Sequence, residues 1–303
     1  MAPEEMAAPT IAAALDGAAL AYFDGRLTEA ALRLARAARA AGVPVLVEGE
    51  RLRPGLDELL AEADYVEWTG EACLADAVLE VARRLPRARV VVTTRGTRGS
   101  VLLRRAAEGE QPVSDAPTSL EEVMGRLEQQ LAASDAAAAA SAPVDCVSAS
   151  GVALRRGGVA GSGGALQLTF SGGRDAAAAA RRAGAAAAKE AARNADTGNA
   201  AGYAAGQGAA SSTAVEEPPL LAEVLLASAA ALAKDYVADT TGAGDSFIGS
   251  LIYGLTTGLP LPRALQLAAV VAACKCTALG ARPGLPRRGQ LSADLLGVKG
   301  RGL

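Results

Sequence analysis

The segment DTTGAGDSF, residues 239–247, joins a glycine-rich turn directly to the predicted start of a helix over 243–258. Glycines let the backbone approach an anion closely, and the free N–H groups and positive dipole end of a helix N-terminus attract phosphate. We therefore expect the backbone N–H groups of Gly242, Ala243 and Gly244 to form an anion hole. Asp245 lies in the first helical turn, where a carboxylate is favoured and can accept a proton from a hydroxyl aimed at that phosphate.

The composition of this turn favours phosphoryl transfer over a purely structural role. Such transfer needs mainly in-line positioning and stabilisation of the developing charge, which a turn of this kind supplies together with a base. The alternative is an ordinary helix start with an aspartate in its first turn. That alternative accounts for Asp245 but not for both glycines, so we expect a phosphate-transfer site here.

Outward from this motif, apolar runs that alternate with helical patterns predict an α/β fold. Residues 18–104 have the pattern of βαβ units with a mainly parallel sheet. The RGTRG segment after residue 94 is expected to be a turn, because two glycines three positions apart break either regular period. A helix over 262–279 follows the motif helix. The expected strands are 18–23, 43–48, 65–68, 89–94 and 100–105, and the expected helices are 28–41, with Thr28 as its N-cap, 55–63, 71–85 and a last turn over 290–297.

Residues 106–237 have a different character, with long runs of alanine and glycine. Such low-complexity sequence buries little area against the entropy that its ordering costs. We expect a mostly disordered insertion that is largely dispensable to the fold. Within it, 119–132 predicts an amphipathic helix with Ser119 and Glu122 as a capping box, 165–170 a strand, and 175–193 a transient helix.

The overall composition restricts the kinds of function. The chain has 303 residues, is 50% hydrophobic and 3% aromatic, and carries a net charge of −3. Because it has no basic stripe and no long apolar run, we expect neither a nucleic-acid partner nor a membrane partner, and a cytoplasmic location with a plastid left open. Its four cysteines are expected to be buried apolar groups. It has no histidine, which excludes Ser-His-Asp catalysis and His-based metal sites.

The motif resembles the C-terminal signature D-T-x-G-A-G-D-x-F of the ribokinase-like (PfkB) carbohydrate kinases, without a gap. Further segments fit the same family: YFDGR (22–26), the run 43–66, VVVTTRGTRGS (91–101) and AACKCTALGARPGLP (272–286), which look closest to a plant and algal branch. The resemblance implies a ribokinase-like, Rossmann-type α/β fold, mainly parallel and flanked by helices. It covers about 1–105, the first part of the core, and 238–303, the catalytic part, with 106–237 between them as the insertion. Residue 1 would then correspond to the middle of a family member, whose first strands, lid and sugar-binding segment would precede it.

The resemblance also assigns roles to individual residues. Asp245 would be the base and Gly242 to Gly244 the anion hole. Thr69 and Ala72 take the two positions of a magnesium-organising family motif, and Glu71 lies one residue away from its register. Glu71 could act on magnesium through water or be a solvated helix-start glutamate, with magnesium held mainly by the nucleotide. Independently of the resemblance, Arg51 and Arg53 follow the strand expected over 43–48, and charged residues at the C-terminal ends of parallel strands line the crevice of an α/β sheet. They could contact phosphate or be solvated loop residues, and the resemblance favours Arg51. Arg95 and Arg98 flank the turn glycines and have the same two alternatives. The nucleotide-bordering positions are Thr94, Gly96, Gly99, Thr69, Ala269 and Arg51, and part of a monovalent-cation site is expected at Asp239, Thr241 and the Gly280 carbonyl, with Gly284 where a hydroxyl often contributes.

These assignments imply an ATP-dependent phosphotransferase that phosphorylates a hydroxyl of a sugar or related small polyol. ATP and magnesium are the expected cofactors, with potassium as an option, and a homodimer is left open. The alternative is a truncated, non-catalytic homologue that binds only a nucleotide or a partner subunit. ATP is expected to contact the 239–247 turn and the 94–99 turn together, because both are predicted at the C-terminal edge of one sheet.

Overall fold

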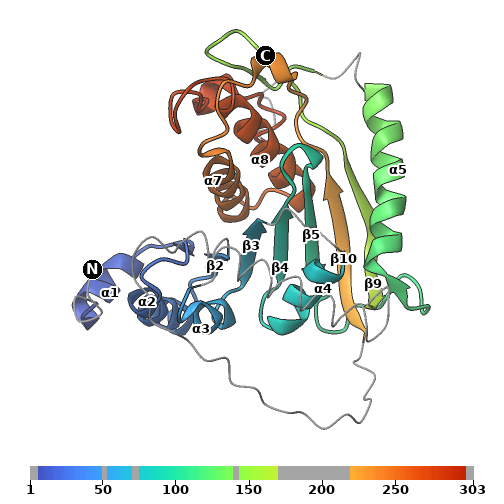
Figure 1. Ribbon diagram of the computed structural model, residues 1–303. Helices are drawn as coiled ribbons and strands as arrows, with labels where there is room; N and C mark the ends of the chain where they lie inside the picture. The colour runs from blue at the N-terminus through green and yellow to red at the C-terminus, as the bar shows by residue number, and fades with distance from the viewer. Residues whose placement is uncertain (1–5, 50–52, 70–74, 139–142, 170–218, 298–303) are drawn as a thin grey trace, which may run out of the picture.

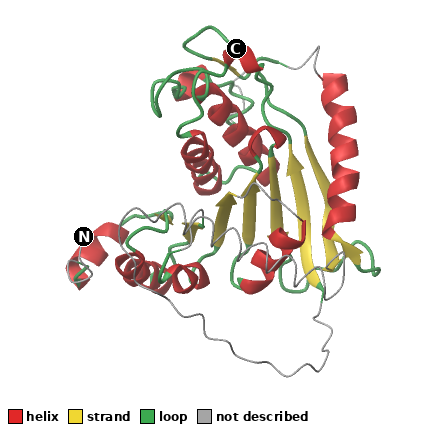
Figure 2. Ribbon diagram, in the orientation of Figure 1, coloured by secondary structure: helices red, strands yellow, loops and turns green. Residues whose placement is uncertain are grey.

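A mixed, mostly parallel sheet organises the chain. The computed structural model describes residues 6–49, 53–69, 75–138, 143–169 and 219–297, and these contain an eight-stranded sheet in the order β1-β2-β3-β4-β5-β10-β9-β6 (Figures 1 and 2). The strands of this sheet are β1 (Ala21–Phe23), β2 (Val45–Glu48), β3 (Tyr65–Thr69), β4 (Val90–Thr94), β5 (Ser100–Arg105), β6 (Thr118–Ser119), β9 (Val159–Thr169) and β10 (Leu220–Ala227).

The first four strands set the direction of the sheet. β1 to β4 pair in parallel, and β5, β10 and β9 continue as antiparallel neighbours, with β6 parallel to β9. Helices connect the parallel strands, as right-handed βαβ units require. The expected α/β fold with a mainly parallel sheet flanked by helices is confirmed. The helices are α1 (Ala8–Leu15), α2 (Thr28–Ala40), α3 (Leu56–Ala61), α4 (Ala75–Arg84), α5 (Leu120–Ala138), α7 (Ala243–Thr256) and α8 (Leu261–Lys275).

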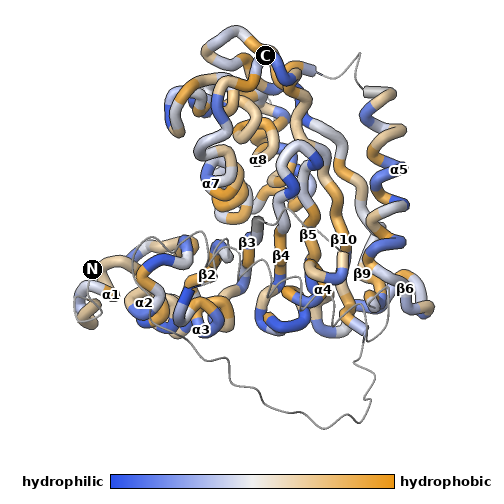
Figure 3. Tube along the Cα trace, in the orientation of Figure 1, coloured by the Kyte–Doolittle hydropathy of each residue, from blue (hydrophilic) through white to orange (hydrophobic). Residues whose placement is uncertain are grey.

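Each face of the sheet carries its own core. On one face, apolar residues of α2, α3, α4 and α5 pack against strand residues such as Val47, Val91 and Leu226. On the other face, Phe247 and Leu251 of α7 and the alanines of α8 pack against Val92 and neighbouring strand residues. Figure 1 shows α5 beside β9, with α7 and α8 on the opposite side, and Figure 3 shows the apolar residues concentrated on the central strands and on α7 and α8. This arrangement places the N-terminus of α7 near the C-terminal ends of the parallel strands.

The prediction of a mostly disordered insertion over 106–237 is wrong for the described part of that range. β9 and β10 lie inside the sheet, and α5 packs its Leu120, Val123 and Leu127 into the core. The reason is that β10 is hydrogen-bonded on both sides, to β5 and to β9, which buries Leu220, Val224 and Leu226. The expected strand over 165–170 coincides with the end of β9 as far as Thr169, and residue 170 and the expected helix over 175–193 lie outside the described residues.

Smaller elements complete the described part of the chain. A two-stranded sheet of β7 (Cys146–Val147) and β8 (Ala153–Leu154) packs near α8, and three short 3₁₀ turns are η2 (Gly96–Arg98), η3 (Lys234–Tyr236) and η4 (Arg288–Gln290). Thr28 is the first residue of α2 and not its N-cap, because the helix begins one residue earlier than that prediction requires, with Leu27 as the N-cap. The Thr28 hydroxyl donates to the Pro54 carbonyl (2.6 Å). Within the described residues, no helix has the length and apolar character needed to cross a bilayer.

Candidate active site

The glycine-rich turn lies at the N-terminus of α7, as expected. Gly242 is the N-cap with φ of 77°, a backbone conformation that favours glycine. A Cβ at this position would lie 3.1 Å from Ala281 Cβ and 3.3 Å from Ala281 Cα. The turn therefore depends on glycine both for its backbone angle and for its close packing against the 280–284 loop.

The backbone donors of the turn differ partly from the expectation. Ala243 N–H donates to the Thr240 carbonyl (3.0 Å), so the prediction of a free N–H at Ala243 is wrong in this structure. Among the described residues, the N–H groups of Gly242 and Gly244 have no acceptor. Two donors remain for an anion, at the positive end of a helix of 14 residues.

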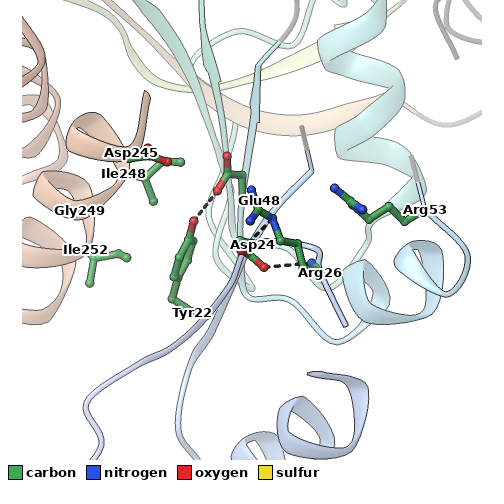
Figure 4. A pocket seen from close by; sticks show the side chains of 9 residues that line it. All are labelled: Tyr22, Asp24, Arg26, Glu48, Arg53, Asp245, Ile248, Gly249 and Ile252. Carbon is green, nitrogen blue, oxygen red and sulfur yellow. Dashed lines mark hydrogen bonds and ion pairs between the residues drawn. The ribbon is translucent and has the colours of Figure 1, made fainter. Parts of the chain in front are cut away.

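Asp245 faces a cavity of about 370 Å³ that lies between α7 and the C-terminal ends of β1 and β2 (Figure 4). The helix contributes Asp245, Ile248, Gly249 and Ile252, whose spacing of three and four residues places them on one face of α7. The strand side of the cavity is polar. It is lined there by Tyr22, Asp24, Arg26, Glu48 and Arg53.

Hydrogen bonds and charges hold the polar side of this cavity in place. The Tyr22 hydroxyl donates to Glu48 Oε2, and the Arg26 guanidinium lies 3.4 Å from Asp24 Oδ2. Burial, then the hydrogen bond to Glu48 and the negative charges of Glu48, Asp24 and Asp245, raise the pKa of Tyr22 far above its ordinary value. Tyr22 therefore stays a neutral hydroxyl that donates to a carboxylate. The negative charge of Asp245 is one of the causes of its raised pKa.

The turn expected to border the nucleotide also lies at the C-terminal edge of the parallel strands. Thr69 ends β3 and Thr94 ends β4, where the two residues are paired neighbours. Thr94 Oγ1 donates to Glu67 Oε1 (3.0 Å), an interaction that the sequence did not suggest. Gly96 is exposed, with φ of 57° and open space around it. Gly99 has φ of 82°, and a Cβ there would clash with the Ala227 carbonyl group. This position therefore requires glycine because it packs closely against the end of β10.

Other predicted contacts have different surroundings. Ala269 of α8 is 9% exposed and packs among apolar residues near β7 and β8, which leaves little surface for a nucleotide. The Arg95 side chain is 6% exposed and its guanidinium donates to Glu128 of α5 (2.8 Å), so it is tied to that helix. Arg53 lines the cavity. The predictions for Arg51 and Glu71 concern residues outside those that the structure describes.

The three residues expected at a monovalent-cation site do lie together. Asp239 Oδ1 accepts from Thr241 N–H (2.8 Å) and Oδ2 accepts from Gly280 N–H (2.8 Å). Gly280 thus contacts Asp239 through its N–H, whereas the prediction named its carbonyl. These bonds, with a smaller contribution from Lys275, lower the pKa of Asp239 to about 2. Lys275 Nζ donates to the Asp239 carbonyl (2.6 Å). A free cation on the same oxygen would repel this ammonium by about 4 kcal/mol at 4 Å separation near a protein surface, so the residues present do not fit it.

Several lining residues of the cavity were not identified from the sequence as site residues, namely Tyr22, Asp24, Arg26 and Glu48. A usable signal existed, since polar residues at the C-terminal ends of adjacent parallel strands meet in the crevice of an α/β sheet. The same signal had identified Arg53. Glu67, buried at 1% exposure in the middle of an apolar strand, was a second signal of a polar function at this edge.

Comparison with known proteins agrees with the motif. Residues 174–288 match the model of the pfkB family carbohydrate kinases. That match begins inside the range that was expected to lie outside the resemblance. A segment of 62 residues is 39% identical to a ribokinase from Lactococcus lactis subsp. lactis (strain IL1403), covering 20% of this chain and 21% of that protein.

Solved structures match this chain at low sequence identity and with TM-scores below 0.5. The Arabidopsis thaliana ribokinase complexed with ribose and ATP matches with a TM-score of 0.48 at 16% identity, over 96% of this chain and 59% of that chain. The Burkholderia thailandensis nucleoside kinase in complex with inosine matches with a TM-score of 0.44 at 13% identity, over 93% and 58%. This chain thus spans a little under three fifths of the length of these two structures. The match over residues 174–288 makes this part of the chain similar to the pfkB family carbohydrate kinases.

Proposed function

We propose that this chain is an ATP-dependent phosphotransferase that phosphorylates a hydroxyl of a sugar or related small polyol. The observation that carries the proposal is the position of Asp245. Its carboxylate faces a polar cavity from the first turn of α7, and the same turn presents the N–H groups of Gly242 and Gly244 to an anion. Base and anion site are thus three residues apart on one rigid element.

The proposed reaction uses these groups in one displacement. The Asp245 carboxylate accepts the proton of the substrate hydroxyl as the hydroxyl oxygen attacks the γ-phosphorus of ATP. The new O–P bond forms as the bond to the β,γ-bridging oxygen breaks, and ADP leaves with the electron pair of that bond. The N–H groups of Gly242 and Gly244 and the dipole of α7 stabilise the charge on the transferred group.

The polar side of the cavity supports a hydroxyl-bearing substrate. Carboxylates such as Asp24 and Glu48 accept hydrogen bonds from hydroxyl groups, and Arg26 and Arg53 donate to oxygens. A volume of about 370 Å³ is in the range of small-molecule sites. The solved relatives are named as complexes with ribose and with inosine, which makes a pentose or a nucleoside the first substrates to test.

Magnesium, when bound with ATP, would neutralise phosphate charge. Among the described residues, no group of three or more carboxylate, cysteine or histidine side chains could hold a metal ion. Thr69, Thr94 and Gly96 are proposed to face the nucleotide because they share the C-terminal edge of the parallel strands with the cavity. The part of Glu71 in magnesium binding stays a prediction.

The first experiment is a calorimetric titration of the chain with MgATP, followed by transfer of labelled phosphate from ATP to ribose and to inosine. We expect ATP binding that saturates at or below millimolar concentration, and transfer to at least one acceptor. Binding without transfer to any sugar or polyol would favour the binding-only alternative. A folded preparation that binds no ATP at millimolar concentration would contradict both readings of the site.

Gly242→Val tests the anion site. Valine is strained at a φ of 77° and its side chain would contact Ala281, so the turn must change its conformation. The two N–H donors of the turn would then no longer point toward a bound phosphate. We expect ATP affinity to fall about tenfold or more, together with the transfer rate. Gly125→Ala is the control, because this helical glycine of α5 has open space around it and does not line the cavity. Equal ATP affinity of Gly242→Val and the unmodified chain would remove the anion hole from the proposal.

A further inference from the structure

Lys275, the last residue of α8, is completely buried, with a side-chain exposure of 0%. Its ammonium donates to the backbone carbonyl of Asp239 at 2.6 Å and lies 4.0 Å from Asp239 Oδ2. Within the part of the chain that the structure describes, no other acceptor for this ammonium is found. Burying a charge costs free energy unless the charge is paired and fully hydrogen-bonded. Buried charges with few partners are characteristic of functional sites.

The ammonium lies directly behind the anion-binding turn. Asp239 precedes Gly242 by three residues, and its carboxylate binds the N–H groups of Thr241 and Gly280. The N–H of Ala238 donates to the Cys276 carbonyl (2.8 Å) at the end of α8. The backbone that leads into the turn is therefore held between α8 and the 280–284 loop, with Lys275 at the centre of the contact.

The charge of Asp239 is available for this contact at every ordinary pH. Its pKa is lowered from 3.8 to about 2, first by the N–H of Thr241. A carboxyl group with a lowered pKa contributes stability that is present above its ordinary pKa and is lost as the pH falls through the lowered value. The negative charge that Asp239 brings to this contact is therefore unaffected by changes around neutral pH.

The surroundings of Lys275 leave no ligand set for a free cation. The Asp239 carbonyl is already occupied by the ammonium, and both carboxylate oxygens of Asp239 accept backbone hydrogen bonds. Gly284 packs on the backbone of Lys275, since a Cβ at this glycine would lie 2.8 Å from Lys275 Cα. The loop therefore has no side-chain oxygen at this position and no space for one.

We propose that Lys275 is a built-in cation that positions the anion-binding turn, so that nucleotide binding by this chain needs no added potassium. Lys275 acts through Asp239 and is a positioning residue. The proposal rests on the proposed kinase function for its ligand, ATP. It concerns the charge behind the turn, whereas the kinase proposal concerns the groups that face the ligand.

The first test compares the unmodified chain in potassium chloride and in tetramethylammonium chloride at equal ionic strength. We expect the dissociation constant for MgATP to agree within about twofold, and the melting temperature without nucleotide to be equal in the two salts. Tighter ATP binding by about tenfold in potassium, or a melting temperature raised by potassium alone, would overturn the proposal.

The second test replaces the ammonium by an apolar side chain of similar length. Lys275→Met should weaken ATP binding by about tenfold or more in tetramethylammonium. Potassium should restore part of that loss, because the variant frees the backbone carbonyl oxygen of Asp239 for an external cation. Lys234→Met, a change at an exposed lysine of η3, is the matched control and should bind ATP normally. Normal ATP binding by Lys275→Met in both salts would contradict the positioning role.

The outcomes separate this proposal from the kinase proposal. ATP binding that requires potassium would contradict the role of Lys275 and leave the kinase assignment intact. Absence of ATP binding in both salts would contradict the kinase assignment, while the melting comparison, which needs no nucleotide, would still decide whether a free cation binds behind the turn. The same comparison decides the matter if Lys275→Met does not fold.

Discussion

Asp245→Asn should lower the rate of phosphoryl transfer by about 10²- to 10⁴-fold, the range for loss of a general base. Asparagine has the size of aspartate and keeps a hydrogen-bonding group at the helix start, but it does not accept the proton of a substrate hydroxyl. ATP affinity should change much less, because the N–H groups of Gly242 and Gly244 remain in place. Single-turnover transfer from labelled ATP to ribose or inosine measures the rate, and calorimetry measures the affinity.

Two controls make this result specific. Asp235→Asn changes an exposed aspartate in η3 just before the motif and should leave both quantities unchanged. Loss of a carboxylate near a helix N-terminus costs about 0.3–1 kcal/mol of stability, so the melting temperature of Asp245→Asn should fall only slightly. Near-normal transfer by Asp245→Asn would remove the base assignment, and most of the proposed mechanism with it.

Local sequence signals predicted the parts of the fold whose cause is local. The strands over 45–48 and 90–94 are short β-branched runs, and α2 carries alanines at helical spacing that become its buried face. The anion-binding turn was equally predictable, since its geometry depends on glycine at Gly242 and on the helix that follows. For these elements, the residues themselves determine the conformation.

The parts that were missed depend on contacts between distant segments. Residues 220–227 form an apolar run that is compatible with a buried strand, but the place of β10 inside the sheet depends on its pairing with β5 and β9. The cavity combines side chains that follow β1 and β2 with Asp245, more than 190 positions later in the chain. Lys275 was indistinguishable in sequence from a solvated helix-end lysine, because its burial arises from the 238–241 segment and the packing of Gly284.

The middle of the chain gives the sharpest test of the sheet. β9 pairs with β10 along its length and with β6 at its end, and it buries Leu166 and Leu168 in the core. Removal of residues 133–215 would delete β9 and leave one side of β10 unpaired. Each buried leucine contributes about 1.5–3 kcal/mol, and a domain of this kind has about 5–15 kcal/mol in total. We expect this deletion to abolish the cooperative melting transition and to cause aggregation through the exposed strand edge.

A shorter deletion provides the matched control. Leu168 of β9 pairs with Leu220 of β10, so the two ends of the connection already lie side by side in an antiparallel pair. Replacing residues 172–216 by a four-residue glycine and serine linker keeps every described strand, and the closure entropy of a loop changes only logarithmically with its length. The melting temperature of this variant should lie within a few degrees of that of the unmodified chain, as followed by circular dichroism. If the 133–215 deletion melted as cooperatively as the linker variant, β9 would not be part of the folded sheet; if the linker variant alone failed to fold, the segment between β9 and β10 would contribute to the core in its own right.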